Sequence, residues 1–183
     1  MLTFRHYSNI FEPNLDLERL KKEINFTREN INNNGEWIPE SRLTCWMSDY
    51  DITLEYSEKS MKPNPLTPYI KEIRQKLFEK FNIYFDSVLA NYYGDNTIGM
   101  RYHSDPILDK WDTNFMIVSI GDSRNIIFRD ATNFDTKFKF ELKNGDIIHM
   151  FDDCQDKYQH SIRKEKVAKN TRISLVFKRS IKK

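Results

Sequence analysis

Two histidines and one aspartate are spaced so that their side chains could meet at one metal ion. His103 and Asp105 lie two residues apart in Tyr102-His103-Ser104-Asp105, at the end of an expected strand. Residues i and i+2 of a strand point to the same side, so the imidazole and the carboxylate can converge. A His-x-Asp tripeptide alone is common and usually marks a surface pair. It gains weight from His160, which lies 55 residues after Asp105 in the strand-like Tyr158–Ile162 and can bring a third ligand.

Two histidines and one carboxylate form the facial triad of non-haem Fe(II) oxygenases, which leaves three coordination positions free for a chelating cosubstrate and dioxygen. The chain has two further histidines. His149 could compete for the third place, since it shares a strand face with Ile147 and Phe151, but we interpret it as a barrel-filling or surface histidine. His6 precedes the first expected helix in a region without other ligands, so we expect a surface residue there.

A cosubstrate with two carboxylate groups needs a fixed cation, and the last expected strand offers one. Within residues 172–179 the even-numbered positions share one face. A guanidinium group can bind both oxygens of a carboxylate, so Arg172 is the expected anchor, with the Ser174 hydroxyl beside it. Lys178 lies roughly 20 Å from Arg172 along an extended strand, so the two side chains could bracket a short dicarboxylate. The alternative for Lys178 is a solvated tail charge, and Arg179 falls on the opposite, solvated side.

Asn91 and Tyr93 form a further polar pair, because they occupy one face of a strand just before the His-x-Asp segment. Their amide and phenol groups could form hydrogen bonds with oxygens of the cosubstrate. Taken without the flanking motifs, Asn91 would be interpreted as a turn residue and Tyr93 as a core aromatic.

These side chains need a β framework to hold them, and the second half of the chain predicts one. After Phe81, short runs rich in Ile, Val, Phe and Tyr alternate with turn residues at a period of two. The expected strands are Ser87–Tyr93, Ile98–His103, Phe115–Ile120, Asn125–Arg129, Phe138–Leu142, Ile147–Phe151, Tyr158–Ile162 and Arg172–Phe177. About eight strands at this spacing predict a sandwich or rolled-up barrel. Asn144-Gly145-Asp146 is expected to be a hairpin turn.

Two helices are expected before these strands, where they would buttress one sheet. The first covers Leu15–Phe26, with its apolar residues on one face and Asn14 as its expected N-cap. The second ends near Phe81. Thr67 is a good N-cap for it and Pro68 suits its first position. The residues that keep its helical spacing are Ile70, Ile73, Leu77 and Phe81.

The composition indicates one soluble globular domain and excludes several classes of function. The 183 residues are 39% hydrophobic, 31% charged and 14% aromatic, and the longest apolar run, Phe115–Val118, is too short to span a membrane. We expect no secretory signal, and the distant Cys45 and Cys154 indicate no disulfide framework, so a reducing compartment, cytoplasm or nucleus, is expected. Five glycines cannot build a dinucleotide fingerprint or a P-loop.

The charge distribution is uneven although the net charge is only +2. Residues 157–183 carry ten Lys or Arg and one acidic residue, Glu165. This basic segment could attract a polyanion such as nucleic acid. A solvated basic strand face is the alternative.

The order Asn91-x-Tyr93, His103-x-Asp105, His160 and Arg172-x-Ser174-x-x-x-Lys178 resembles the AlkB family of Fe(II)/2-oxoglutarate dioxygenases. The surroundings also fit. They comprise Ser41-Arg42-Leu43-Thr44 with Trp46, the segment Pro63–Pro68, Ile117–Gly121 with Phe128-Arg129, and Asn144-Gly145-Asp146. With the amino-terminal helix included, the resemblance covers nearly the whole chain.

The resemblance implies a double-stranded β-helix, a cupin-like jelly roll, within a mainly β fold with flanking helices (α+β). Residues 1–183 would form a single dioxygenase domain, with 1–82 as helical buttress and substrate lid and 83–180 as the β core. His103, Asp105 and His160 match the residues that hold Fe(II) in the family. Arg172 matches the arginine that meets the distal carboxylate of 2-oxoglutarate, and the other positions matched to the cosubstrate are Asn91, Tyr93, Ser174 and Lys178.

The activity implied is oxidative removal of a methyl group from a base nitrogen in alkylated DNA or RNA. O2 would be the second cosubstrate, and succinate, CO2 and formaldehyde would be released. The target base would be flipped into the site. By analogy with the family's base-stacking aromatic, Trp46 is a candidate substrate residue with Arg42 nearby, and an ordinary core tryptophan is the alternative. We expect a monomer that acts on alkylated nucleic acid and has no membrane partner.

Three positions depart from the family pattern, and they affect the expected cosubstrate affinity and the expected identity of the substrate. Lys178 stands where arginine is common in the family. Lysine supplies a positive charge but cannot bind both oxygens of a carboxylate as arginine does, so weaker cosubstrate affinity is expected. Ser174 stands where asparagine is common. Pro106 follows Asp105 where repair members often carry an acidic residue that touches the damaged base. This leaves open a hydroxylase or demethylase of a protein or small molecule. A third alternative is an inactive nucleic-acid-binding barrel, which would have no need for the whole ligand set.

Overall fold

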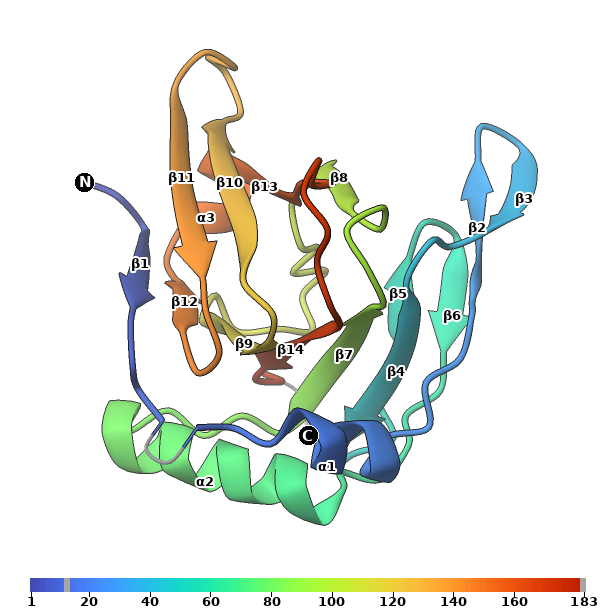
Figure 1. Ribbon diagram of the computed structural model, residues 1–183, viewed down its shortest axis with the longest axis vertical. Coiled ribbons are helices and arrows are strands. Elements are labelled where there is room, and N and C mark those ends of the chain that lie inside the picture. Colours follow the sequence, from blue (N-terminus) through green and yellow to red (C-terminus); the bar gives the residue numbers. More distant parts are fainter. Residues whose placement is uncertain (12–13, 182–183) are drawn as a thin grey trace.

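The strands of the chain form two facing sheets in the computed structural model, which describes residues 1–11 and 14–181 (Figure 1). Within each sheet the paired neighbours are antiparallel. The larger sheet has the order β1 (Phe4–Tyr7), β12 (Ile147–Met150), β9 (Phe115–Gly121), β14 (Arg172–Lys178), β7 (Ser87–Tyr93) and β4 (Leu43–Ser48). The smaller sheet has the order β11 (Lys137–Leu142), β10 (Arg124–Asp130), β13 (Tyr158–Ile162) and β8 (Met100–His103).

Helices α1 (Leu17–Glu23) and α2 (Pro68–Phe81) cover one side of the larger sheet, and the smaller sheet lies on its other side (Figure 1). A short helix, α3 (Cys154–Lys157), leads directly into β13. The predicted mainly β fold, with two helices buttressing one sheet, is confirmed. Over residues 1–11 and 14–181, no helix has the length and apolar character needed to cross a membrane.

Helix α2 has the start and the buried face that its sequence predicts. The Thr67 hydroxyl accepts the backbone N–H of Ile70, and Pro68 occupies the first turn, where its missing N–H costs nothing. The helix ends at Asn82, whose φ of 54° places it in the left-handed region that commonly terminates helices. Its side chains that pack against the larger sheet are Tyr69, Ile70, Ile73 and Leu77.

Helix α1 is shorter than expected and begins two residues later. Its N-cap is Asp16, whose carboxylate accepts the backbone N–H of Arg19 at 3.0 Å, so the prediction of Asn14 as the cap was wrong. The Asp16 N–H also donates to the Tyr69 hydroxyl at 2.8 Å. This contact with α2 fixes Asp16, whose own backbone is extended, and the spacing of apolar residues gives no sign of it.

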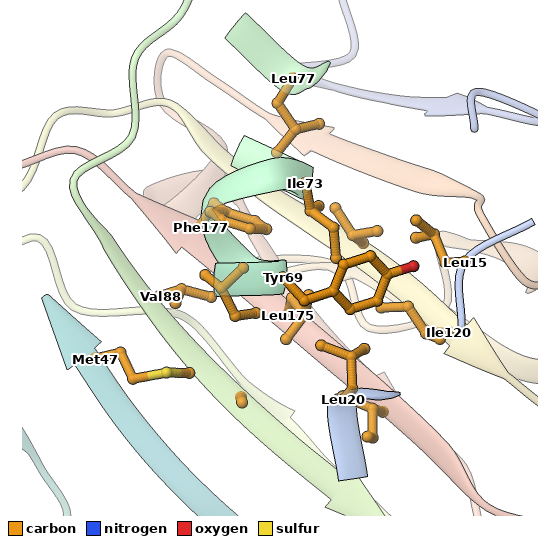
Figure 2. Packing of buried hydrophobic residues seen from close by; sticks show 14 of the residues in the cluster. Leu15, Leu20, Met47, Tyr69, Ile73, Leu77, Val88, Ile120, Leu175 and Phe177 are labelled. Atoms are coloured by element: carbon orange, nitrogen blue, oxygen red, sulfur yellow. The ribbon is translucent and has the colours of Figure 1, made fainter. Parts of the chain in front are cut away.

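Alternation along β14 divides the interior into two cores. The odd-numbered Ile173, Leu175 and Phe177 pack against the helices, as Figure 2 shows for the last two beside Tyr69 and Ile73. The even-numbered side chains point the other way, into the space between the sheets. Burying one large apolar side chain stabilises a fold by about 1.5–3 kcal/mol, so this register is strongly specified.

Residues 1–82 supply strands as well as helices, which the sequence analysis did not expect. β1 pairs with β12 and β4 pairs with β7, so both edges of the larger sheet come from this segment. Five of the six residues of β4 are buried, so it lacks the apolar–polar alternation of a half-exposed strand. The segment also forms two hairpins beside the sheet, β2 (Asn30–Asn33) with β3 (Glu36–Pro39) and β5 (Leu54–Tyr56) with β6 (Lys59–Met61).

The turn at Asn144-Gly145-Asp146 does not close a hairpin, contrary to expectation. It joins β11 of the smaller sheet to β12 of the larger one. Gly145 has a φ of +86°, as the tight turn requires, and its N–H donates to the carbonyl of Ser119 at 2.8 Å. The turn therefore docks on β9 and carries the chain from one sheet to the other.

Candidate active site

The structure brings His103, Asp105 and His160 together between the two sheets. His103 ends β8 and His160 lies in the middle of β13, and the two residues pair directly across these strands. Their ring centroids are 4.3 Å apart. Asp105 follows two residues after β8, and one ligand atom from each of the three side chains lies within 4.8 Å of the others. The predicted convergence on one point is therefore observed.

The environment keeps these three groups in the protonation states that bind a cation. Burial, and then the neighbouring His103, lowers the pKa of His160 to about 3. Burial also lowers the pKa of His103. Burial alone would raise the pKa of Asp105, but the Lys178 ammonium, followed by the two histidines, outweighs it and holds the value at about 2. At neutral pH the cluster thus offers two neutral imidazoles and one carboxylate.

Hydrogen bonds around the cluster orient its members. His103 Nδ1 lies 2.8 Å from the carbonyl oxygen of Arg101, which can only accept, so Nδ1 carries the proton and Nε2 is free to bind a metal. The Asp105 N–H donates to Gln155 Oε1 at 2.8 Å. Gln155 is a buried residue of α3 and was not singled out from the sequence, since no local pattern links it to a loop 50 residues away.

Arg172 presents two unused donors in the buried interior. Its Nε donates to Ser119 Oγ at 2.8 Å, whereas Nη1 and Nη2 have no partner among the described protein atoms. Burial lowers the pKa of Arg172 to about 10, which leaves the guanidinium charged at neutral pH. Buried donors of this kind are rarely left without an acceptor. A carboxylate group is the partner that both Nη atoms fit.

Lys178 lies at the other end of the same strand face, close to Asp105. Its Nζ is 3.6 Å from Asp105 Oδ1 and 3.8 Å from the centroid of the Phe115 ring. The side chain is almost fully buried. Lys178 therefore faces Asp105 and also lines the cavity, and the expectation that Arg172 and Lys178 bracket a dicarboxylate stays a prediction. Arg179 is exposed as expected.

Asn91, Tyr93 and Ser174 all line one cavity with the metal-ligating cluster. The side-chain oxygen of Asn91 accepts the Nε–H of Arg42 at 2.8 Å. The Tyr93 ring centroid lies 5.4 Å from Arg172 Cζ. Arg172 itself is not among the described residues that line the cavity, and it lies behind the wall, against Tyr93.

The cavity has a volume of about 250 Å³ and lies between the sheets. His103, Asp105 and His160 all line it. Its apolar wall includes Leu54, Leu89, Ile117, Ile126, Ile162 and Val176. Tyr56 of the β5–β6 hairpin and Arg42 also line the cavity, and Arg42 Nη1 lies 3.0 Å from Met100 Sδ of β8. Tyr56 was missed in the sequence because the short strand β5 has no periodic pattern around it.

The two candidate substrate residues have different positions. Arg42 lines the cavity, with its Nη1 3.3 Å from Glu40 Oε1. Trp46 is fully buried on β4, packs edge-on against Trp111 and donates its indole N–H to the carbonyl of Ile52 at 2.8 Å. The structure therefore gives Trp46 the packing role that was the alternative interpretation.

The remaining histidines lie outside the cluster. His149 Nε2 is 2.9 Å from Asn114 Oδ1, and the ring packs near Phe151. His6 Nε2 is 3.0 Å from a carboxylate oxygen of Asp146. Neither residue lines the cavity. Both are half-buried, so His6, which was expected at the surface, is a structural partner of Asp146 instead.

The donor set fits a ferrous ion with a dicarboxylate cosubstrate. Two imidazoles and one carboxylate on one side of a site are typical of non-haem Fe(II) enzymes. Asp105 Oδ2 is buried and has no hydrogen-bond partner in the described part of the chain, as expected of an oxygen reserved for a metal. In the same way, the Nη atoms of Arg172 have no hydrogen-bond partner in the described part of the chain, as expected of donors that would bind a carboxylate group of the cosubstrate.

Comparisons with known proteins place this geometry in a family. A family model described as the 2OG-Fe(II) oxygenase superfamily matches residues 1–178. The protein "Uncharacterized protein R406" of Acanthamoeba polyphaga mimivirus is 38% identical, over 90% of this chain and 88% of its own length. The mouse "Alpha-ketoglutarate-dependent dioxygenase alkB homolog 3" is 25% identical over 94% of this chain, and the match spans 63% of the mouse protein.

A further relative and a solved structure extend the comparison. The mouse "DNA oxidative demethylase ALKBH2" is 23% identical over 79% of this chain and 64% of its own length. "The structure of OsALKBH1" superposes with a TM-score of 0.70 at 13% identity, covering 97% of this chain and 98% of that one, which shows a shared fold. The chain therefore belongs to the 2OG-Fe(II) oxygenase superfamily and is an AlkB-like 2-oxoglutarate- and Fe(II)-dependent dioxygenase.

Proposed function

We propose that this dioxygenase demethylates N-alkylated bases of DNA or RNA by oxidation. The observation that carries the proposal is the cavity of about 250 Å³ that joins the His103, Asp105 and His160 cluster to an aromatic side chain, Tyr56. This volume is below that of most pockets for drug-sized ligands and suits one flat ring beside a short cosubstrate. The match to the mouse protein named as a DNA oxidative demethylase supports the same kind of substrate.

Each residue of the site has a role in this proposal. His103, Asp105 and His160 hold Fe(II), and Arg172 binds the distal carboxylate of 2-oxoglutarate through its two free Nη atoms. Asn91, Tyr93 and Ser174 line the same cavity and would contact the cosubstrate. When bound, Fe(II), 2-oxoglutarate and O2 insert one oxygen atom into a methyl C–H bond of the substrate while the cosubstrate is oxidised to succinate and CO2. The N-hydroxymethyl product then loses formaldehyde and leaves the free base nitrogen.

The chain itself orients the reactants and excludes water. The apolar wall, represented by Leu89, Ile126 and Val176, keeps the methyl group in a dry environment. Lys178 keeps Asp105 ionised through their 3.6 Å contact, so the carboxylate does not take up a proton when the metal leaves. Arg42 lines the cavity and can donate a hydrogen bond there, whereas the Tyr56 hydroxyl already donates to Glu40.

The test is a reaction of the purified chain with Fe(II), 2-oxoglutarate and an oligonucleotide that carries one methylated base. Formaldehyde should appear, and the oligonucleotide should lose the mass of one methylene group. Asp105→Ala should abolish both, since two protein ligands hold iron poorly. Asp156→Ala, which removes an exposed carboxylate of α3, is the matched control and should leave both unchanged.

Two results would contradict the proposal at different levels. Turnover of 2-oxoglutarate with every methylated oligonucleotide left intact would refute the nucleic-acid substrate and favour a protein or small-molecule substrate. Absence of any iron-dependent succinate formation would refute the roles assigned to the three ligands.

We also infer a reducing compartment, because Cys45 and Cys154 are both buried free thiols. The monomeric state stays a prediction, to be checked by light scattering on the purified chain.

A further inference from the structure

A buried carboxylate behind the cavity wall, Glu40, is shared by two cations. Glu40 Oε2 lies 2.8 Å from Lys59 Nζ, and Glu40 Oε1 lies 3.3 Å from Arg42 Nη1. All three side chains are almost fully buried. Burial of charges is tolerated when they are paired, but here one negative charge faces two positive ones. The cluster of Glu40, Arg42 and Lys59 by itself therefore carries one excess positive charge, and the carboxylate of Glu29, outside the cluster, also acts on Lys59.

Tyr56 links this cluster to the cavity. The Tyr56 hydroxyl lies 3.3 Å from Glu40 Oε2, to which it donates, and Lys59 Nζ lies 4.1 Å from the centroid of its ring. Tyr56 lines the cavity, whereas Lys59 is not among the described residues that do. The ammonium group already interacts with the electron-rich face of this ring. Tyr56 is thus less able to stabilise a second cation stacked on it.

The cavity wall offers no free carboxylate to balance this charge. Among the described lining residues, Asp105 belongs to the metal-ligating cluster, and Glu55 is an exposed rim residue whose Oε2 lies 3.0 Å from Lys110 Nζ. Pro106, which follows Asp105 and also lines the cavity, carries no charge. A positively charged substrate would therefore meet Arg42, whose partner Glu40 is shared with Lys59, and would find no free carboxylate on the described wall.

We propose that the cavity selects an alkylated base that is electrically neutral over one that carries a formal positive charge. The inference rests on the proposed function and specifies its substrate class. Methylation at N1 of adenine or N3 of cytosine leaves a cationic ring at neutral pH, whereas methylation at N3 of thymine leaves a neutral one. The Arg42 guanidinium only donates hydrogen bonds, so it complements the carbonyl oxygens of N3-methylthymine or N3-methyluracil. One uncompensated charge a few ångströms from a ring is worth roughly a tenfold difference in affinity, or more.

The experiment uses four oligonucleotides of one sequence that each carry a single N3-methylthymine, N6-methyladenine, N1-methyladenine or N3-methylcytosine. Equilibrium binding is measured anaerobically with Mn(II) and 2-oxoglutarate, and formaldehyde release is measured in air with Fe(II). The neutral bases, and N3-methylthymine above all, should bind at least about tenfold more tightly than the cationic ones, with a matching order of kcat/KM. Equal or tighter binding of the cationic bases would overturn the inference.

Variants assign the selectivity to named residues. Lys59→Met removes the excess charge while Glu40 keeps Arg42 as its partner, so the preference for neutral bases should fall by roughly tenfold. Lys62→Met, which removes an exposed lysine three residues further along, is the control and should leave the preference unchanged. An equal effect of both substitutions would show a nonspecific charge effect and overturn the inference. If Lys59→Met does not fold, Pro106→Asp adds a carboxylate to the cavity wall and should favour the cationic bases.

The two proposals fail in distinguishable ways. If cosubstrate is turned over but no oligonucleotide is demethylated, the proposed function is wrong, and the binding measurements still decide the charge preference. If a cationic base is demethylated most efficiently, the function stands and the charge selectivity is refuted. If none of the four is bound, both are refuted.

Discussion

Replacing Arg172 by methionine should separate cosubstrate binding from folding. Arg172 is fully buried, its Nε donates to Ser119, and its two Nη atoms have no partner in the described part of the chain. A hydrogen bond to a charged group contributes about 1.5–3 kcal/mol, so the two that would be given to a carboxylate are together worth about 3–6 kcal/mol. The dissociation constant of 2-oxoglutarate should therefore rise by a factor of roughly 10²–10⁴.

Thermal unfolding with Mn(II), with and without 2-oxoglutarate, measures this effect. At a cosubstrate concentration 100 times its dissociation constant, the wild-type chain should gain about 2.7 kcal/mol, or about 5–11 °C for a domain of this size. The Arg172→Met variant should gain no more than about 2 °C. Without cosubstrate its stability should stay within about 1 kcal/mol of wild type, because the lost Ser119 hydrogen bond is offset by the removal of unpaired buried donors.

The control for this experiment is Arg179→Met, which removes an exposed guanidinium at the end of the same strand. It should respond to 2-oxoglutarate as the wild type does. A cosubstrate-dependent shift of the same size in Arg172→Met and in wild type would refute the role of Arg172.

Three further perturbations test the burial and packing of the site. His160, whose pKa is lowered to about 3, stays neutral in the folded chain below pH 6.5 and takes up a proton only on unfolding. Without metal, the free energy of unfolding should therefore fall as the pH drops below about 6.5. The fall should reach up to about 1.4 kcal/mol per pH unit for each histidine that behaves in this way. Urea titrations of His160→Gln should show a shallower dependence, and an unchanged slope would contradict the low pKa. Burial raises the pKa of Cys45 to about 11 and that of Cys154 to about 12. Neither thiol should therefore react with Ellman's reagent until the chain unfolds. Fast labelling of the native protein would argue against their burial. A Cβ at Gly99 would lie 2.7 Å from the carbonyl oxygen of Ile162. Gly99→Ala should therefore lower the free energy of unfolding by about 1–3 kcal/mol and weaken Mn(II) binding. A urea midpoint equal to that of the wild type would show that β8 can shift without loss of stability.

Much of the site could be predicted because its residues lie on regular strands. The period of two placed Arg172, Ser174 and Lys178 on one face, and the structure shows Ser174 and Lys178 lining the cavity. The same rule placed His103 and Asp105 on one side, and they meet His160 as expected. Strand periodicity thus determines which side chains can meet once the sheets are paired.

The rest depends on contacts between segments that are distant in the sequence. Glu40 and Lys59 meet because the β5–β6 hairpin folds back beside β4, and no local pattern in either segment signals an ion pair. Trp46 was assigned to the substrate pocket by analogy, but the strong burial of β4 places it in the core. The contact between Lys178 and Asp105 was not predicted, because the spacing within one strand does not show which residues of the facing sheet lie opposite.

The division of the site between two sheets has a mechanical consequence. The imidazoles belong to β8 and β13 of the smaller sheet, whereas Arg172 belongs to β14 of the larger one, and the two sheets are not joined by a shared strand ladder. A molecule bound to the metal at one end and to Arg172 at the other would cross the space between the two sheets and link them. Pulling the sheets apart in a single-molecule force experiment should then require more force when 2-oxoglutarate and Mn(II) are both present than when either is added alone.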